Sequence, residues 1–135
     1  MKDPTGELLT AFASALSSIA YNGATWHVYT EQPPKGQRNY IYLSDIVLNE
    51  NMDKSHYIFN GIIGIQISTI KNKYCRTIAN SLSNSILVAL TKVTLSMTSF
   101  TMIISSFPNS VEISEETTES NFIKRLSLTF STQQK

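Results

Sequence analysis

The chain has 135 residues, a length that fits one domain with a single hydrophobic core. Its 11 Lys and Arg residues nearly balance 10 Asp and Glu, so the net charge of +1 gives no bulk attraction to nucleic acid or to anionic lipid. One cysteine excludes an internal disulfide, and one cysteine with two histidines provides no ligand cluster for zinc. Without a signal-peptide pattern or a run of about 18 apolar residues, we expect a soluble protein made in the cytoplasm.

Charge is scarce as well as balanced. Only 16% of the residues are Asp, Glu, Lys or Arg, against roughly 25% in an average soluble domain. The ranges 8–30, 77–91 and 93–111 contain none of them. Charged groups are depleted at the centre of protein interfaces, so we interpret these ranges as surface that neighbouring subunits bury. The alternative interpretation is a composition rich in Ser, Asn, Ile and Thr with no such role.

The first predicted element is a helix, with Asp3 as its N-cap and Pro4 in its first helical position. Its apolar stripe consists of Leu8, Leu9, Phe12, Ala15, Leu16 and Ile19. The pair Asn22-Gly23 is expected to end it. A short strand over residues 25–29 and a proline-containing loop over residues 31–37 follow.

A long β-hairpin is the most distinct pattern in the sequence. Residues 40–48 and 56–70 both alternate along the chain and are rich in β-branched and aromatic residues. Residues 49–54 between them are polar and rich in Asn and Asp, which favour turns. Gly61 and Gly64 within the second arm indicate a bulge or bend that curves it.

The period then changes from two to between three and four, which predicts a helix over residues 72–90. Its apolar face consists of Cys75, Ile78, Ala79, Leu82, Ile86, Ala89 and Leu90. Its outer positions Asn80, Ser81, Ser83 and Asn84 are small and uncharged, which predicts a second face at a subunit contact.

The remainder is predicted to be strands. A strand over residues 91–100, with Val93 and Leu95 on one face, continues extended over 102–107 until Pro108-Asn109 turns the chain. A further strand is expected near Val111 and Ile113, then a polar turn over residues 112–121 and a last strand over 122–132. The order α, β, β, β, α, β, β, β predicts an α+β fold: a mostly antiparallel sheet with a long hairpin and two helices on one face, in a single domain over residues 1–135.

The sequence offers little for catalysis. Cys75 lies on the apolar face of the second helix, which favours a buried structural thiol. Neither His27 nor His56 is accompanied by a nucleophile motif, a paired carboxylate or an orienting group at a recognisable spacing. We therefore predict no catalytic residue, no cofactor and no metal ligand. The alternative is a small enzyme that uses His27 or His56.

Charge gathers in two short segments, a basic one at the start of the second helix and an acidic one in the predicted late turn. The sequence leaves two interpretations open. The segments are a solvated helix end and a solvated loop, or they are patches that meet on adjacent subunits. The candidate interface residues are Lys71, Lys73, Arg76, Asn80, Ser83, Asn84, Glu112, Glu115, Glu116, Glu119, Lys124 and Arg125.

This layout resembles the tail terminator, or tail completion, proteins of long-tailed bacteriophages. The resemblance covers essentially the whole chain and depends on order and spacing more than on invariant residues. The matching segments are the helix before Val28-Tyr29, the Pro33-Pro34 loop, Tyr40-Ile41-Tyr42-Leu43, His56-Tyr57-Ile58-Phe59, residues 63–68, Ala79-Asn80-Ser81-Leu82, residues 86–90 and the closing strand 125–130.

The resemblance implies a structural virion protein without catalysis. It would form a homohexameric ring at the head-proximal end of the tail, end tube polymerisation and dock to the head-neck connector or stopper protein, with DNA only as passing cargo. The acidic segment would then face a neighbour or the DNA channel. The hairpin tip, Asn49, Glu50, Asn51, Met52, Asp53 and Lys54, would meet the tube protein. The alternative within the same machine is a head-side stopper or connector adaptor.

Overall fold

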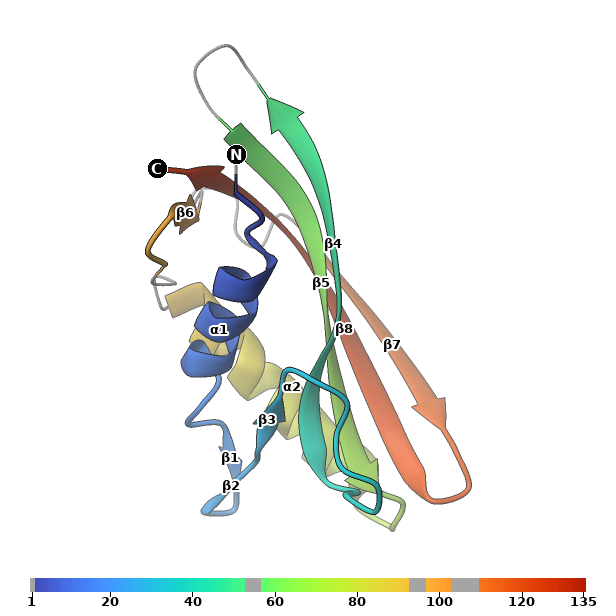
Figure 1. The fold of residues 1–135 in the computed structure, drawn as a ribbon. Helices are drawn as coiled ribbons and strands as arrows, with labels where there is room; N and C mark the ends of the chain where they lie inside the picture. Colours follow the sequence, from blue (N-terminus) through green and yellow to red (C-terminus); the bar gives the residue numbers. More distant parts are fainter. Residues whose placement is uncertain (1, 53–56, 93–96, 103–109) are drawn as a thin grey trace.

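The computed structural model describes residues 2–52, 57–92, 97–102 and 110–135 (Figure 1). Its helices are α1 (Thr5–Ala15) and α2 (Cys75–Lys92). Its strands are β1 (Ala20–Tyr21), β2 (Ala24–Thr25), β3 (Val28–Tyr29), β4 (Tyr40–Met52), β5 (Tyr57–Ile70), β6 (Phe100–Met102), β7 (Val111–Thr117) and β8 (Asn121–Gln134).

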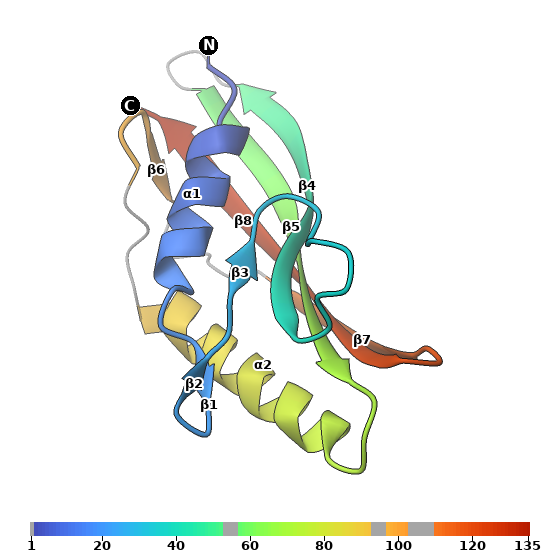
Figure 2. The same cartoon turned by 60° about the horizontal axis from the view of Figure 1, so that its bottom comes forward.

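The main sheet has the order β3-β4-β5-β8-β6, with β7 also paired to β8. Among the described strands of this sheet, only β3 and β4 run parallel; the other pairs are antiparallel. Strand β8 is bordered along one edge by β7 near its start and by β6 near its end. Both helices lie on the same face of this sheet (Figures 1 and 2). The predicted α+β fold, with its mostly antiparallel sheet and long hairpin, is confirmed.

The core lies between the helices and the inward side chains of the central strands. The ring of Phe12 on α1 lies 5.9 Å from that of Phe130 on β8, which joins the first helix to the last strand. The predicted stripe of α2 packs on the sheet with Ala79, Leu82, Ile86 and Leu90 fully buried. The buried residues from the sheet include Ile41, Leu43, Phe59, Ile63, Ile65, Ile67, Phe122, Leu126, Leu128 and Phe130.

A β-bulge at Ser44 reverses the faces of β4. The pairing with β5 shifts between Leu43 and Asp45. Before the shift Ile41 and Leu43 point into the core, and after it Ile46 packs there instead. An extra residue in one strand moves the following side chains to the other face. The bulge therefore keeps apolar residues inward along both halves of the strand.

The glycines of β5 lie where neighbours approach closely. Gly64 pairs with Asp45 at the bulge, and a Cβ there would lie 3.0 Å from the Ser44 hydroxyl oxygen. The predicted irregularity therefore exists, but it lies on β4, opposite the glycine. Gly61 is buried, and a Cβ there would come within 2.7 Å of both Leu48 and Phe130.

The first helix is shorter than predicted. Pro4, not Asp3, is the N-cap residue and has no side-chain capping bond. The Asp3 carboxylate instead accepts hydrogen bonds from the Thr5 backbone N–H at 2.9 Å and from its hydroxyl at 2.6 Å. The helix ends at Ala15, so Leu16 and Ile19 reach the core from the following turn.

The pair Asn22-Gly23 forms a hairpin turn, not a helix end. Both residues have positive φ, 55° and 83°, as the tight turns of two-residue hairpins require. It connects β1 to β2. The single strand predicted over residues 25–29 is two short strands, because Thr25 pairs with Ala20 in this hairpin, whereas Val28 pairs with Ile41 of the main sheet.

Two predictions near the C-terminal half are wrong. Helix α2 begins at Cys75 and extends to Lys92, so the strand predicted from Thr91 does not begin there. The polar turn predicted over 112–121 is mostly strand β7, and the turn itself spans residues 118–120. The predictions for Asp53, Lys54, His56, Val93, Leu95, residues 103–107 and Pro108-Asn109 lie outside the described residues.

Candidate assembly surfaces

The described residues bring no catalytic constellation together. No group of three His, Cys, Asp or Glu side chains among them could hold a metal ion. His27 is exposed, and its ring lies 4.3 Å from that of Tyr29. Cys75 is half-buried and packs against the core. Neither α1 nor α2, the helices of the described chain, is long and apolar enough to cross a membrane.

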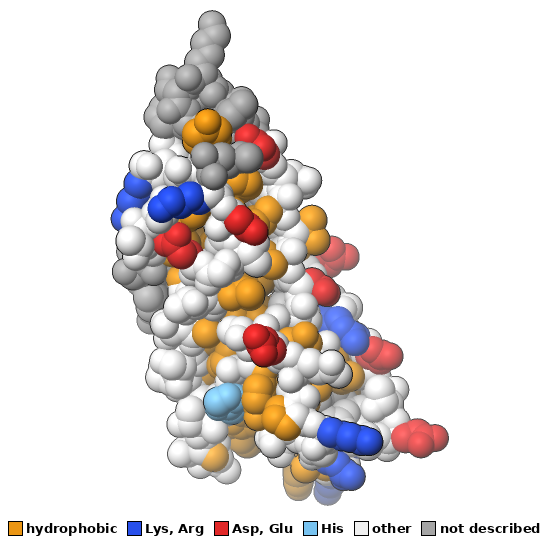
Figure 3. Space-filling model, viewed as in Figure 1, with side chains coloured by type: hydrophobic (Ala, Val, Ile, Leu, Met, Phe, Trp, Pro, Cys, Tyr) orange, Lys and Arg blue, Asp and Glu red, His pale blue; other side chains and the backbone are white. Residues whose placement is uncertain are grey.

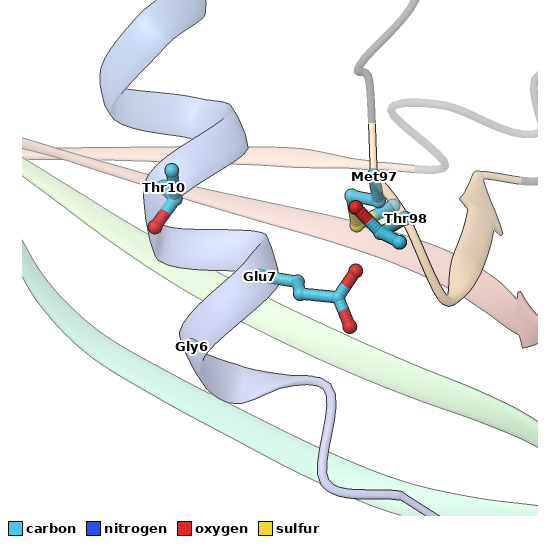
Figure 4. A pocket seen from close by; sticks show the side chains of 5 residues that line it. All are labelled: Gly6, Glu7, Thr10, Met97 and Thr98. Carbon is cyan, nitrogen blue, oxygen red and sulfur yellow. The ribbon is translucent and has the colours of Figure 1, made fainter.

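A small pocket lies between α1 and the segment before β6 (Figure 4). Glu7 points from the helix toward Met97 and Thr98, and its carboxylate accepts the backbone N–H of Ser99 at 2.8 Å. This hydrogen bond lowers the pKa of Glu7. The carboxylate thus holds the chain that enters β6, which is a structural role.

Glu115 is the centre of a charge network on the helix side of the sheet. Its carboxylate lies 3.2 Å from Nε of Arg76 on α2 and 3.5 Å from Nζ of Lys124 on β8. The Lys124 ammonium also donates to Oδ1 of Asn80 at 2.6 Å. The Lys124 side chain is only 10% exposed. Four candidate interface residues therefore connect β7, β8 and α2 within one chain.

A second pair lies on the opposite face of the same two strands. Arg125 Nη1 donates to Glu116 Oε2 at 2.7 Å, and both side chains are about half exposed. Exposed pairs contribute only about 0–1 kcal/mol. Although the pair adds little stability, the opposite charges of Arg125 and Glu116 largely neutralise each other. Neither side chain therefore presents an unpaired charge to a partner.

The predicted outer face of α2 is only partly exposed. Asn80 and Asn84 are exposed, but Ser83 is 3% exposed, so its placement on the outer face is wrong. The helix contacts both β5 and β8. The buried face of α2 is therefore wider than the stripe predicted from apolar residues at steps of three and four.

One end of the molecule carries a basic patch that we call the basic end: Lys35, Arg38, Lys71 and Lys73, all exposed. Figure 3 shows Lys and Arg side chains gathered at its lower end, where β5 ends in Figure 1. Lys71 and Lys73 were predicted from the sequence as interface residues, but Lys35 and Arg38 were not. Their only signal was a basic residue on each side of Gly36-Gln37 in a loop.

Hydrogen bonds join the three segments that form the basic end. The Arg38 carbonyl accepts from the Ser68 hydroxyl at 3.1 Å and from the Asn121 amide at 2.8 Å. The Asn39 side chain accepts the N–H of Ile70 at 2.8 Å. The N–H of Lys71 donates to the carbonyl oxygen of residue 120 at 2.9 Å. The cations of the basic end therefore lie on segments that hydrogen bonds hold together.

The other candidate surface is on the sheet face opposite the helices. Cross-strand pairing places Asp45, Gly64, Ser127 and Glu112 in one row across β4, β5, β8 and β7. The adjacent row contains Val47, which is 55% exposed, and Ile62, which is 45% exposed. We call Asp45, Val47, Ile62 and Glu112 the outer-face patch. The sequence could not show whether Asp45 was paired or solvent-facing; it is exposed.

These features define an α+β protein with two exposed candidate surfaces, the basic end and the outer-face patch. No protein-family model matches the chain, and no curated protein matches its sequence. A solved structure does have this fold: a chain in "Virion of native gene transfer agent (GTA) particle" superposes with a TM-score of 0.71 at 17% sequence identity. The match covers 99% of this chain and 98% of that chain. At this identity the likeness shows the fold.

Proposed function

We propose that this chain is a structural, non-catalytic protein of a phage-like virion. The observation that carries the proposal is the full-length likeness, in both directions, to a chain of a gene transfer agent virion. The low charge content agrees with it, because 16% charged residues leave much uncharged surface for burial against other subunits.

Within such a particle we propose the role of tail terminator. The chain would form a homohexameric ring that caps the head-proximal end of the tail tube, ends tube polymerisation and docks to the head-neck connector or stopper. The support is the order of elements shared with that family and the long β4–β5 hairpin, whose arms of 13 and 14 residues exceed the usual strand length of about five or six. The protein would be made in the host cytoplasm and reside in the neck of the virion.

The test is removal of the gene from a particle-producing cell, followed by electron microscopy and by mass spectrometry of purified particles. A terminator predicts the chain in intact particles and tubes of uncontrolled length in its absence. Tails of normal length that fail to join heads would identify the stopper or connector adaptor instead. Particles that lack the chain would overturn the proposal altogether.

A further inference from the structure

Two groups of cations among the described residues differ in their ion pairing. Arg76, Lys124 and Arg125 lie in ion pairs with Glu115 or Glu116. Those of the basic end have no ion pair with any described residue. The hydrogen bonds at the basic end close the end of the sheet, which gives them a structural role. That role does not explain why the segments at the basic end carry unpaired positive charge.

Apolar side chains accompany these cations. Tyr74 is 59% exposed and Ile70 is 38% exposed, both at the end where β5 leads into α2. The Lys73 ammonium lies 5.6 Å from the centre of the Tyr74 ring. An exposed tyrosine beside unpaired cations is the composition of a protein interface centre with a charged rim.

The outer-face patch has the complementary composition. Asp45 and Glu112 are exposed and have no ion pair within the described part of the chain. They lie at the two ends of one row, with only Gly64 and Ser127 between them. The apolar pair Val47 and Ile62 lies directly beside that row. Small residues between the carboxylates leave room for a side chain from a partner.

We propose that the basic end of one copy of this chain docks on the outer-face patch of a second copy. Tyr74 and Ile70 contact Val47 and Ile62, while Lys71 and Lys73 face the carboxylates. Both halves of the contact are present on one chain, and their charges are opposite. The contact deepens the proposed function, on which it rests, by naming the surfaces through which the subunits join.

The two surfaces are different, so the contact is head to tail. In such a contact the joined pair keeps one free basic end and one free outer-face patch, so the chain of copies closes into a ring or continues. A symmetric dimer would satisfy both surfaces of both copies at once. The two arrangements therefore predict different behaviour when variants are mixed.

The experiment uses two variants, each with one disabled surface. The first replaces two cations of the basic end and the tyrosine beside them, with Lys71→Ser, Lys73→Ser and Tyr74→Ser. The second introduces a like charge on the outer face with Ile62→Lys. We expect each alone to self-associate at least about tenfold more weakly than wild type, as loss of a central apolar contact implies. An equimolar mixture should form a dimer and nothing larger, because one intact end meets one intact face. Native mass spectrometry counts the subunits.

The matched control is Ile113→Lys, which makes the same substitution at another exposed isoleucine in a strand, on the helix side of β7. It should assemble like wild type, and circular dichroism should show that all variants are folded. A wild type that stays monomeric up to about 1 mM, variants that assemble normally, or a mixture without dimers would each overturn the contact. Absence of the chain from virions would instead overturn the proposed function.

Discussion

At Gly61 the two strands that flank β5 leave no room for a side chain. An added Cβ would lie 2.7 Å from Leu48 Cδ2 and Phe130 Cζ, and 3.0 Å from the Val47 carbonyl oxygen. Phe130 is held in the core and the carbonyl belongs to the sheet, so Gly61→Ala should destabilise the fold by about 1–3 kcal/mol. Gly6→Ala is the control: no atom lies within 4 Å of its Cβ, and alanine in a helix should be neutral or stabilising by up to about 1 kcal/mol. Urea unfolding measures both, and equal stability of the two variants would contradict the prediction.

Glu7 should make the fold sensitive to acid. Its hydrogen bond from the Ser99 backbone lowers its pKa below the ordinary 4.5. Because the folded-state pKa is the lower one, the contribution to stability is present above pH 4.5 and is lost as the pH falls through the folded-state pKa. Glu7→Gln keeps an acceptor oxygen but cannot titrate, so its stability should fall less steeply than wild type below pH 4.5. Urea unfolding at a series of pH values checks this, and identical slopes would exclude the role.

Strand β7 is held to the rest of the fold by its pairing with β8 and by the Glu115 network. Lys124 is nearly buried and joins Glu115 to Asn80. Lys124→Ala should destabilise the fold by about 1–3 kcal/mol, because it removes a nearly buried side chain together with its ion pair and its hydrogen bond. Lys71→Ala, at an exposed position without an ion pair in the described chain, should change stability by less than about 0.5 kcal/mol. Amide exchange in β7 should accelerate only in the first variant; unchanged exchange there would show that strand pairing alone holds β7.

Periodicity predicted the elements whose neighbours bury one face. The second arm of the long hairpin was predicted because Ile63, Ile65 and Ile67 recur at every second residue. The stripe of α2 was predicted because Leu82 and Ile86 belong to a series at steps of three and four. The start of strand β7 was predicted near Val111 and Ile113, but the rest of it was predicted as a polar turn, because all of its residues are exposed and its inward-facing position 115 is a glutamate. Glu115 is compatible with that position only because β8 places Lys124 opposite it.

The same limit applies to the candidate site. The sequence shows that charge gathers near Lys71 and Glu112, but ion pairing depends on the register of β7 against β8 and on the position of α2. Arg125 and Glu116 therefore appeared to be free for a partner although they pair with each other. Asp45 reaches the outer face through the bulge at Ser44, which no local pattern in β4 indicated.

At the scale of the whole molecule, the hairpin of β4 and β5 extends beyond the helices (Figure 1). We expect deletion of residues 49–54 to leave the core folded, because the buried residues of both arms lie before and after this range. If the tip meets the tube protein, the deletion should weaken binding to purified tubes and disturb control of tail length. Co-sedimentation with tubes measures binding, and circular dichroism is the control for folding. Unchanged tail length in particles that carry the deletion would refute a docking role.

Association of whole subunits should depend only modestly on salt. Exposed charge pairs contribute about 0–1 kcal/mol each, whereas the contact between Tyr74 and Ile62 proposed above is apolar and is not screened. At about 1 M salt the screening length falls to roughly 3 Å, so oligomers should weaken without dissolving. Light scattering across a salt series measures their size. Complete dissociation at moderate salt would show that charge dominates the contact. No change with salt, together with normal assembly after Glu112→Lys, would leave the charges of both surfaces without a part in association.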